Sequence, residues 1–300
     1  MTAYAPHYRY IAPAQVAHYD LPRLVLGMIL IEAGYHLGLN LVDAFLASAP
    51  DSFVDAVHGG TSRTGLMLQL FSFVIFGIAA MMVTKHLHER PAITLFGPPA
   101  QAWSDLKRAT AGGLLAFGLI EFLPPYYPMQ GAILNAPIAW ISTLPLAMFA
   151  ILIQTGAEEI VYRGYLQQQI AARFRHPAIW LIVPNLLFAS AHWDTTGGVG
   201  AAQAYVIWAF FFGLAASDLT ARSGTIGAAI GFHLANNAFA FMAFGTEGHP
   251  DSGLALILFP APDSLLPPSV TEAQFDFPQL TIELLVIAIL WLAARIAIKR

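Results

Sequence analysis

The stretch APIAWISTLPLAMFAILIQTGAEEIVYRGYLQQQI, residues 136–170, decides the fold class. From Ala136 to Gly156 it contains no charged residue, and about 20 such residues cross a bilayer as an α-helix. Two adjacent glutamates, Glu158 and Glu159, follow directly, and Arg163 comes one helical turn later. Ionisable groups inside or beside a span are costly, and they are candidates for a functional site. The stretch therefore predicts a membrane helix that carries a polar site near its end.

The composition of the whole chain agrees with a membrane protein. Of its 300 residues, 57% are hydrophobic and 11% are charged, and the mean hydropathy is +0.62. We therefore expect an all-α polytopic bundle that forms one integral-membrane domain over residues 1–300. The absence of cysteine excludes disulfides and thiolate chemistry, and the net charge of -4 without a basic run argues against a nucleic-acid partner. The first 23 residues lack the pattern of a removable signal peptide.

Hydrophobic stretches predict about eight transmembrane helices. The segments run from Leu24 to Leu46, Gly65 to Val83, Ala109 to Leu123, Ile138 to Gly156, Ala178 to Trp193, Val199 to Leu219, Thr225 to Gly245, and Leu280 to Ile298. If the N-terminus is cytoplasmic, every Lys and Arg except Arg63 falls on the cytoplasmic side. The positive-inside rule produces such a bias, so we predict that both termini are cytoplasmic. The segment from Thr246 to Gln279 is predicted to be an irregular loop on the opposite side.

Three polar clusters lie in the middle of this apolar chain. The first holds Glu158, the second is FASAHWD with His192, and the third is GFHLANNAFA with His233 and Asn237. The RFRHP turn at residues 173–177 lies at similar distances along the chain from Glu158 and His192, which predicts that the two are level across a helical hairpin. A carboxylate, two imidazoles and an amide at one depth are the components of a water-activating site.

Each cluster also has a simpler interpretation. Glu159 and Arg163, spaced i and i+4, fit an ion pair that stabilises two charges near the membrane, so we assign them structural support. A single histidine inside a membrane is more often a hydrogen-bonded core residue than a ligand. The co-location of Glu158, His192 and His233 on three helices is what favours chemistry.

The three clusters resemble the signatures of a known family. EEIVYRG is similar to the EExxxR motif, FASAH to the FxxxH motif, and HLANN to the HxxxN motif of the CPBP intramembrane proteases. That family includes the CAAX prenyl protease type II of eukaryotes and the bacteriocin-processing, Abi-type bacterial proteins. The motifs occur in the right order within residues 140–245, which we take as the catalytic core. The resemblance does not extend to motifs in the first three spans or the last one.

The resemblance implies roles for individual residues. Glu158 corresponds to the catalytic glutamate and His192 to its partner on the attacking water, while His233 and Asn237 form the remaining polar wall. If a metal is present, Glu158, His192 and His233 would be the ligands of zinc or another divalent cation, since a catalytic zinc typically has three protein ligands and a water. A metal-free mechanism with glutamate and histidine uses the same residues.

The expected function is an intramembrane endopeptidase that cleaves membrane-anchored or CAAX-like peptides with activated water. Its partners would be membrane lipid and a membrane-anchored substrate, and its location a bacterial cell (inner) membrane. One alternative is a non-catalytic scaffold or immunity protein, because the family includes such members. Another is an ion-coupled transporter, although the polar residues gather in one half of the chain and no matching interrupted spans occur in the two halves.

Overall fold

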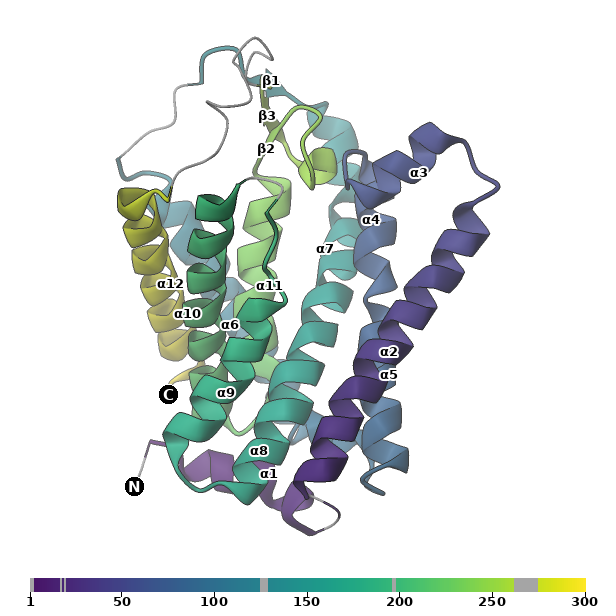
Figure 1. Ribbon diagram of the computed structural model, residues 1–300. Coiled ribbons are helices and arrows are strands. Elements are labelled where there is room, and N and C mark those ends of the chain that lie inside the picture. Colours follow the sequence, from purple (N-terminus) through teal and green to yellow (C-terminus); the bar gives the residue numbers. More distant parts are fainter. Residues whose placement is uncertain (1–2, 17, 19, 125–128, 196–197, 262–274) are drawn as a thin grey trace.

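The computed structural model describes residues 3–300 except 17, 19, 125–128, 196–197 and 262–274 (Figure 1). The chain forms a helical bundle with a small sheet at one end. The helices are α1 (Ala5–Val16), α2 (Leu21–Leu46), α3 (Asp51–His58), α4 (Arg63–Ser72), α5 (Val74–His86), α6 (Pro99–Ile120), α7 (Pro137–Glu159), α8 (Gln168–Arg173), α9 (Pro177–Ser190), α10 (Val199–Ser223), α11 (Gly227–Met242) and α12 (Phe277–Ile298). A π-helix, η2 (Ile160–Gln167), joins α7 to α8, and short 3-10 helices occur at η1 (Ala92–Leu95) and η3 (Ser252–Leu254).

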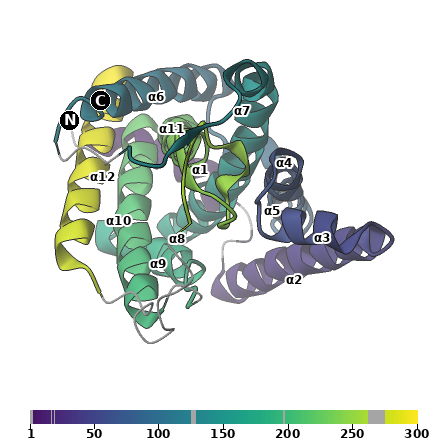
Figure 2. The same ribbon diagram turned by 90° about the horizontal axis from the view of Figure 1, so that it is seen from above.

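Helix α11 lies at the centre of the larger group of helices. It packs against α6, α7, α10 and α12, and its first nine residues, Gly227 to Ala235, are all buried. Seen from above, these helices surround α11, and α2 to α5 lie to one side (Figure 2). A polar side chain on α11 is therefore held inside protein rather than in lipid.

Local sequence signals set several helix ends. Asp20 caps α2 because its side chain accepts a hydrogen bond from the backbone N–H of Arg23. Pro177 begins α9, since proline is well suited to the first turn of a helix. Gly224 ends α10 with a φ of 74°, a conformation that glycine adopts without strain.

The predicted hairpin turn at residues 173–177 is confirmed. Helix α8 ends at Arg173 and α9 begins at Pro177, so a short turn joins the helical stretch that carries the acidic pair to the helix that precedes His192. In Figure 1 this turn lies at the lower end of the bundle, near α1 and the C-terminus, which we call the termini end.

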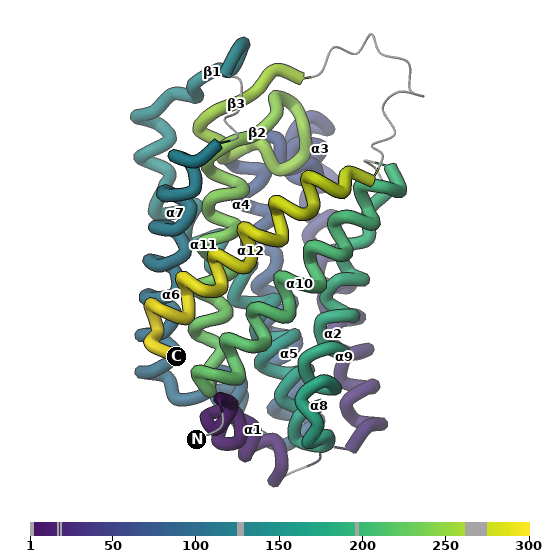
Figure 3. Tube along the Cα trace, turned by 90° about the vertical axis from the view of Figure 1, so that its left-hand side faces the viewer, coloured from purple at the N-terminus to yellow at the C-terminus, as the bar shows by residue number. Residues whose placement is uncertain are grey.

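The opposite end, which we call the strand end, carries a small sheet (Figure 3). Its strands are β1 (Ile133–Leu134), β2 (Phe244–Thr246) and β3 (Ile257–Phe259), in the order β1-β3-β2. Strand β1 pairs antiparallel with β3, matching Ile133 to Leu258, and β2 pairs parallel with β3. The prediction of an irregular loop from Thr246 was thus wrong in part, because backbone pairing with β1 and β2 orders residues 257–259; residues 262–274 lie outside the described part.

Five helical stretches of the described chain are long and apolar enough to cross a membrane. They are Leu21–Leu46, Arg63–His86, Pro137–Arg173, Val199–Ser223 and Phe277–Ile298. The chain is therefore an integral membrane protein with an almost wholly helical fold. Helices also lie at the other predicted segments, in α6, α9 and α11, but α9 has only 14 residues. That eight helices cross the membrane, and that both termini are cytoplasmic, stay predictions.

Candidate active site

The acidic pair lies where α7 changes into a π-helix. Glu158 and Glu159 are the last two residues of α7, and η2 begins at the next residue, Ile160. Every residue of η2 is buried. π-Helical turns are rare and are frequently found at functional sites. In this chain the turn places Arg163 inside the protein, next to the carboxylate four residues before it.

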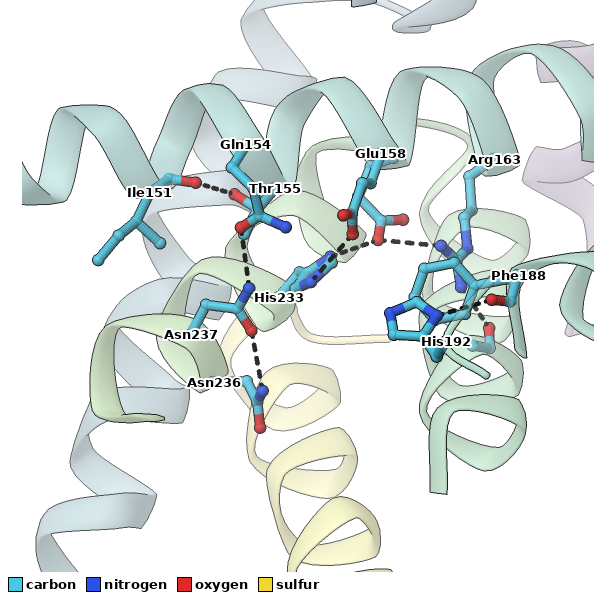
Figure 4. A network of polar contacts seen from close by, with 12 residues as sticks. Ile151, Gln154, Thr155, Glu158, Arg163, Phe188, His192, His233, Asn236 and Asn237 are labelled. Atoms are coloured by element: carbon cyan, nitrogen blue, oxygen red, sulfur yellow. Dashed lines mark hydrogen bonds and ion pairs between the residues drawn. The ribbon is translucent and has the colours of Figure 1, made fainter. Parts of the chain in front are cut away.

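Glu159 links the charged groups of two helices (Figure 4). Its Oε1 accepts hydrogen bonds from Arg163 Nη1 at 3.0 Å and from His233 Nδ1 at 2.8 Å. Glu159 and Arg163 are completely buried, and His233 is 4% exposed. The predicted i, i+4 ion pair is thus present. The contact with His233 was not predicted, and it gives Glu159 a second effect, because it fixes the tautomer and the ring orientation of that histidine.

Arg163 also connects η2 to α9 and α10. Its Nη2 donates to Asn185 Oδ1 and to the carbonyl of Gly213, each at 3.1 Å. Asn185 in turn donates to Ser217 Oγ at 2.8 Å, and the guanidinium lies 4.6 Å from the centre of the Phe188 ring. This network fixes three helices around one buried cation.

Although the Oε2 of Glu159 is also buried without a partner, Glu158 differs from its neighbour in making no hydrogen bond with the described residues. Its Oε2 lies 3.6 Å from His233 Nε2, which is longer than a hydrogen bond, and this buried oxygen has no hydrogen-bond partner within the described residues. Buried polar atoms are nearly always hydrogen-bonded, so an orphan of this kind needs an explanation. A carboxylate oxygen in this position can accept a hydrogen bond from a water or a substrate.

His192 follows the end of α9 by two residues. Its Nδ1 donates to the carbonyl of Phe188 at 2.7 Å, which leaves Nε2 as an acceptor in the neutral ring. The ring lies 4.5 Å from that of Phe188 and 5.4 Å, edge to face, from that of Tyr205. The centre of the Phe188 ring also lies 6.4 Å from that of His233, so both histidines neighbour one phenylalanine.

Asn237 is held by two other amides. Its Nδ2 donates to Gln154 Oε1 at 2.9 Å, and its Oδ1 accepts from Asn236 Nδ2 at 3.0 Å. Gln154 is four residues before Glu158, on the same face of α7. This arrangement leaves one Nδ2 hydrogen of Asn237 for another acceptor.

The structure thus joins most of the predicted site residues through direct contacts. Glu158, Glu159, Arg163 and His233 form one cluster, and Asn237 lies one turn beyond His233 on α11. His192 is connected to this cluster through the Phe188 ring, and Figure 4 shows its side chain in the same region as Glu158 and His233.

Gln154 and Asn185 were missed in the sequence. Both are polar residues in apolar helices, at i-4 from Glu158 and i-7 from His192, so each shares a helix face with a predicted site residue. That spacing was the signal that could have identified them.

The arrangement was also tested against a metal site. Among the described residues no group of three or more His, Asp or Glu side chains is placed so that it could hold a metal ion. Glu159 engages His233 Nδ1, and the other ring nitrogen faces Glu158 at 3.6 Å. Glu158, His192 and His233 therefore do not form a three-ligand set in this conformation, and we derive the chemistry below from the side chains alone.

Comparisons with known proteins agree with the motifs. Residues 139–239 match the family described as "Type II CAAX prenyl endopeptidase Rce1-like". The chain is also 28% identical over 190 residues to "Uncharacterized protein YyaK" of Bacillus subtilis (strain 168), an alignment that covers 59% of this chain and 60% of that relative. No solved structure matches the chain. The matched segment contains all three motifs, so residues 139–239 are similar to the same protease family that the motifs resemble.

Proposed function

We propose that this protein is an intramembrane endopeptidase in which Glu158 activates water for attack on a peptide bond. The observation that supports it most directly is the buried Oε2 of Glu158, which has no hydrogen-bond partner in the part of the chain that the structure describes and faces His233 Nε2 at 3.6 Å. A general base must reach its proton directly or through one water. The family match adds a protease context for the same residues.

The hydrogen bonds suggest how a water would be oriented. Because Glu159 Oε1 accepts from His233 Nδ1, the neutral ring presents a lone pair at Nε2. A water between Glu158 and His233 would donate one O–H to the carboxylate and the other to that nitrogen. Its lone pair would then point toward a bound peptide. Glu158 would take up the proton as the oxygen attacks the carbonyl carbon, and it would later deliver the proton to the leaving amine.

Two further groups would act on the same reaction. The spare Nδ2 hydrogen of Asn237 can donate to the oxyanion that forms at the carbonyl oxygen. His192 Nε2 can accept a hydrogen bond from the water or from the substrate N–H. Glu159 and Arg163 would not touch the substrate, and they would act by orienting His233.

The substrate proposed is a membrane-anchored or CAAX-like peptide. The site lies between helices of a membrane protein, and the matching family is named for prenyl endopeptidases. Zinc or another divalent metal remains a separate proposal. Metal content by mass spectrometry and activity after dialysis against a chelator would decide whether a metal takes part.

The test compares purified native protein with the Glu158→Gln variant in lipid nanodiscs. Lipid-modified and transmembrane peptides are offered, and products are identified by mass spectrometry. We expect cleavage by native protein and a loss of at least about 100-fold in Glu158→Gln, as for removal of a general base. Glu89→Gln is the matched control, because this glutamate is exposed at the termini end.

Two outcomes would contradict the proposal. Equal cleavage by native protein and Glu158→Gln would remove Glu158 from the reaction. A folded native protein that cleaves none of the peptides, with or without added metal, would favour the non-catalytic scaffold or immunity function.

A further inference from the structure

A second feature of α7 lies on the side of the helix opposite Glu158. A groove with a volume of about 390 Å³ opens between α5, α6, α7 and α11, and we call it the α5–α7 groove. On α7 and at the start of η2 its lining residues include Gly156, Ala157 and Ile160, which share one helix face. Glu158 projects from the other face toward His233. The groove is therefore separate from the candidate active site, although the same helical turn forms part of both.

The lining of the groove is apolar throughout. Apart from the indole N–H of Trp103, no lining residue has a polar side chain. Val74 and Ile78 on α5 are 43% and 44% exposed at its edge. Both α5 and α7 belong to stretches that are long and apolar enough to span a membrane. An apolar groove with an exposed edge on such helices is suited to contact with the hydrocarbon of a bilayer.

Two glycines line the groove, and Gly156 adds to its depth. A Cβ added at Gly156 would meet no atom within 4 Å, whereas a Cβ at Gly77 would contact Ala157 at 3.4 Å and Ile160 at 3.8 Å. Each position could therefore accept a methyl group without a clash. The empty space beside Gly156 results from the absence of a side chain at that position.

The edge of the groove carries an aromatic and a basic residue. Trp103 lines it and is 56% exposed, and Lys107, one turn later on α6, places its Nζ 5.6 Å from the centre of the indole ring. On the other wall, Lys85 follows Met81 by one turn of α5 and is exposed. Tryptophan and lysine at the end of an apolar surface are typical of the headgroup level of a membrane. The positive charges would attract an anionic headgroup.

We propose that the α5–α7 groove binds one acyl chain of an anionic phospholipid, with the headgroup phosphate beside Lys107 and Trp103. The volume of the groove fits a single acyl chain better than a helix of another protein, because a helix is about 10 Å across and needs more room. An apolar chain gains from contact with a fully apolar lining. The site is independent of the peptidase proposal, and its bound lipid would contact the back of the turn that carries Glu158.

The test measures lipid retention by native mass spectrometry of the full chain released from detergent. Palmitoyl-oleoyl phosphatidylglycerol is the probe, and the matching phosphatidylcholine is the comparison. We expect one retained phosphatidylglycerol and weaker retention of phosphatidylcholine. Gly156→Leu should fill the groove and reduce retention about tenfold or more, which corresponds to displacing roughly two methylenes of the chain.

Gly118→Leu is the matched control. Gly118 is an exposed glycine of α6 whose added Cβ would also meet no atom within 4 Å, but it does not line the groove. Its retention of lipid should equal that of the native protein. Met81→Trp fills the groove from the opposite wall and serves as a second test if Gly156→Leu does not fold. Lys107→Gln should remove most of the preference for phosphatidylglycerol.

Several results would overturn the proposal. Unchanged retention in folded Gly156→Leu or Met81→Trp would show that the bound lipid lies elsewhere. Equal retention of both phospholipids by the native protein would remove the headgroup contact. Displacement of the lipid by a prenyl alcohol at equal concentration would instead assign the groove to an isoprenoid chain. None of these measurements depends on peptide cleavage, so failure here and failure of the peptidase proposal can be distinguished.

Discussion

The buried charges at the end of α7 lead to a prediction about stability. Glu159 and Arg163 are fully buried and lie 3.0 Å apart, whereas Glu158 makes no hydrogen bond with the described residues and lies 3.6 Å from His233. Glu159→Gln should therefore destabilise the protein strongly, and Glu158→Gln should not. The reason is that the first change leaves a guanidinium in the interior without a counter-charge, while the second removes an unsatisfied charge.

The magnitude follows from the contacts that remain. After Glu159→Gln, Arg163 keeps Asn185 Oδ1 and the carbonyl of Gly213, both neutral acceptors. Removing one partner of a buried ion pair costs about 3–5 kcal/mol, and the glutamine can retain one hydrogen bond, so we expect about 3 kcal/mol. In thermal unfolding this corresponds to a drop in Tm on the order of 10 °C. For Glu158→Gln we expect a change below about 1 kcal/mol.

The assay is thermal unfolding in detergent, followed by the loss of monodisperse protein on size-exclusion chromatography. A double-mutant cycle with Arg163→Gln isolates the pair. Because removal of both charges leaves none uncompensated, the double variant should be more stable than the sum of the single changes predicts, by about 2 kcal/mol. Equal losses for Glu158→Gln and Glu159→Gln, or additive effects in the cycle, would refute the reasoning.

Three further predictions concern other parts of the molecule. Burial lowers the pKa of His7 on α1 from 6.5 to about 4, so between these pH values the unfolded chain binds a proton that the folded protein excludes. The free energy of unfolding should therefore fall by up to ~3 kcal/mol as the pH drops from 6.5 toward 4. His7→Phe should weaken this dependence when unfolding is measured near neutral pH and at about pH 5. Gln154→Leu should release Asn237 and lower kcat by about 10-fold or more at nearly constant KM, and an unchanged kcat would argue against the oxyanion role. Because the chain has no cysteine, a single introduced cysteine reports the topology. Glu89→Cys should react with an impermeant thiol reagent from the cytoplasmic side, and His249→Cys should react from the opposite side. The reverse labelling pattern would invert the predicted topology.

The motifs predicted the location of the site in the chain because the chemistry requires particular residue types at fixed helical spacings. Glu159 and Arg163 at i and i+4 had to share one face of a helix, and the structure confirms their ion pair. The basic, proline-containing turn at residues 173–177 likewise predicted where α8 and α9 are joined. The contacts of Gln154 with Asn237 and of Asn185 with Arg163 were not predicted, because each joins residues at least 22 positions apart in the sequence.

The sequence by itself determined the membrane class, the helical fold and which polar residues are candidates for a site, since hydropathy and helical periodicity are properties of local sequence. It did not determine which partner each carboxylate takes. Only the packing of α7 against α11 gives Glu159 a hydrogen bond to His233 Nδ1 and leaves Glu158 at 3.6 Å from Nε2 of the same ring, although the two residues are adjacent and chemically identical. The π-helical turn and the groove behind it are also products of tertiary packing, because they depend on which helices meet at Ile160 and on the space beside Gly156.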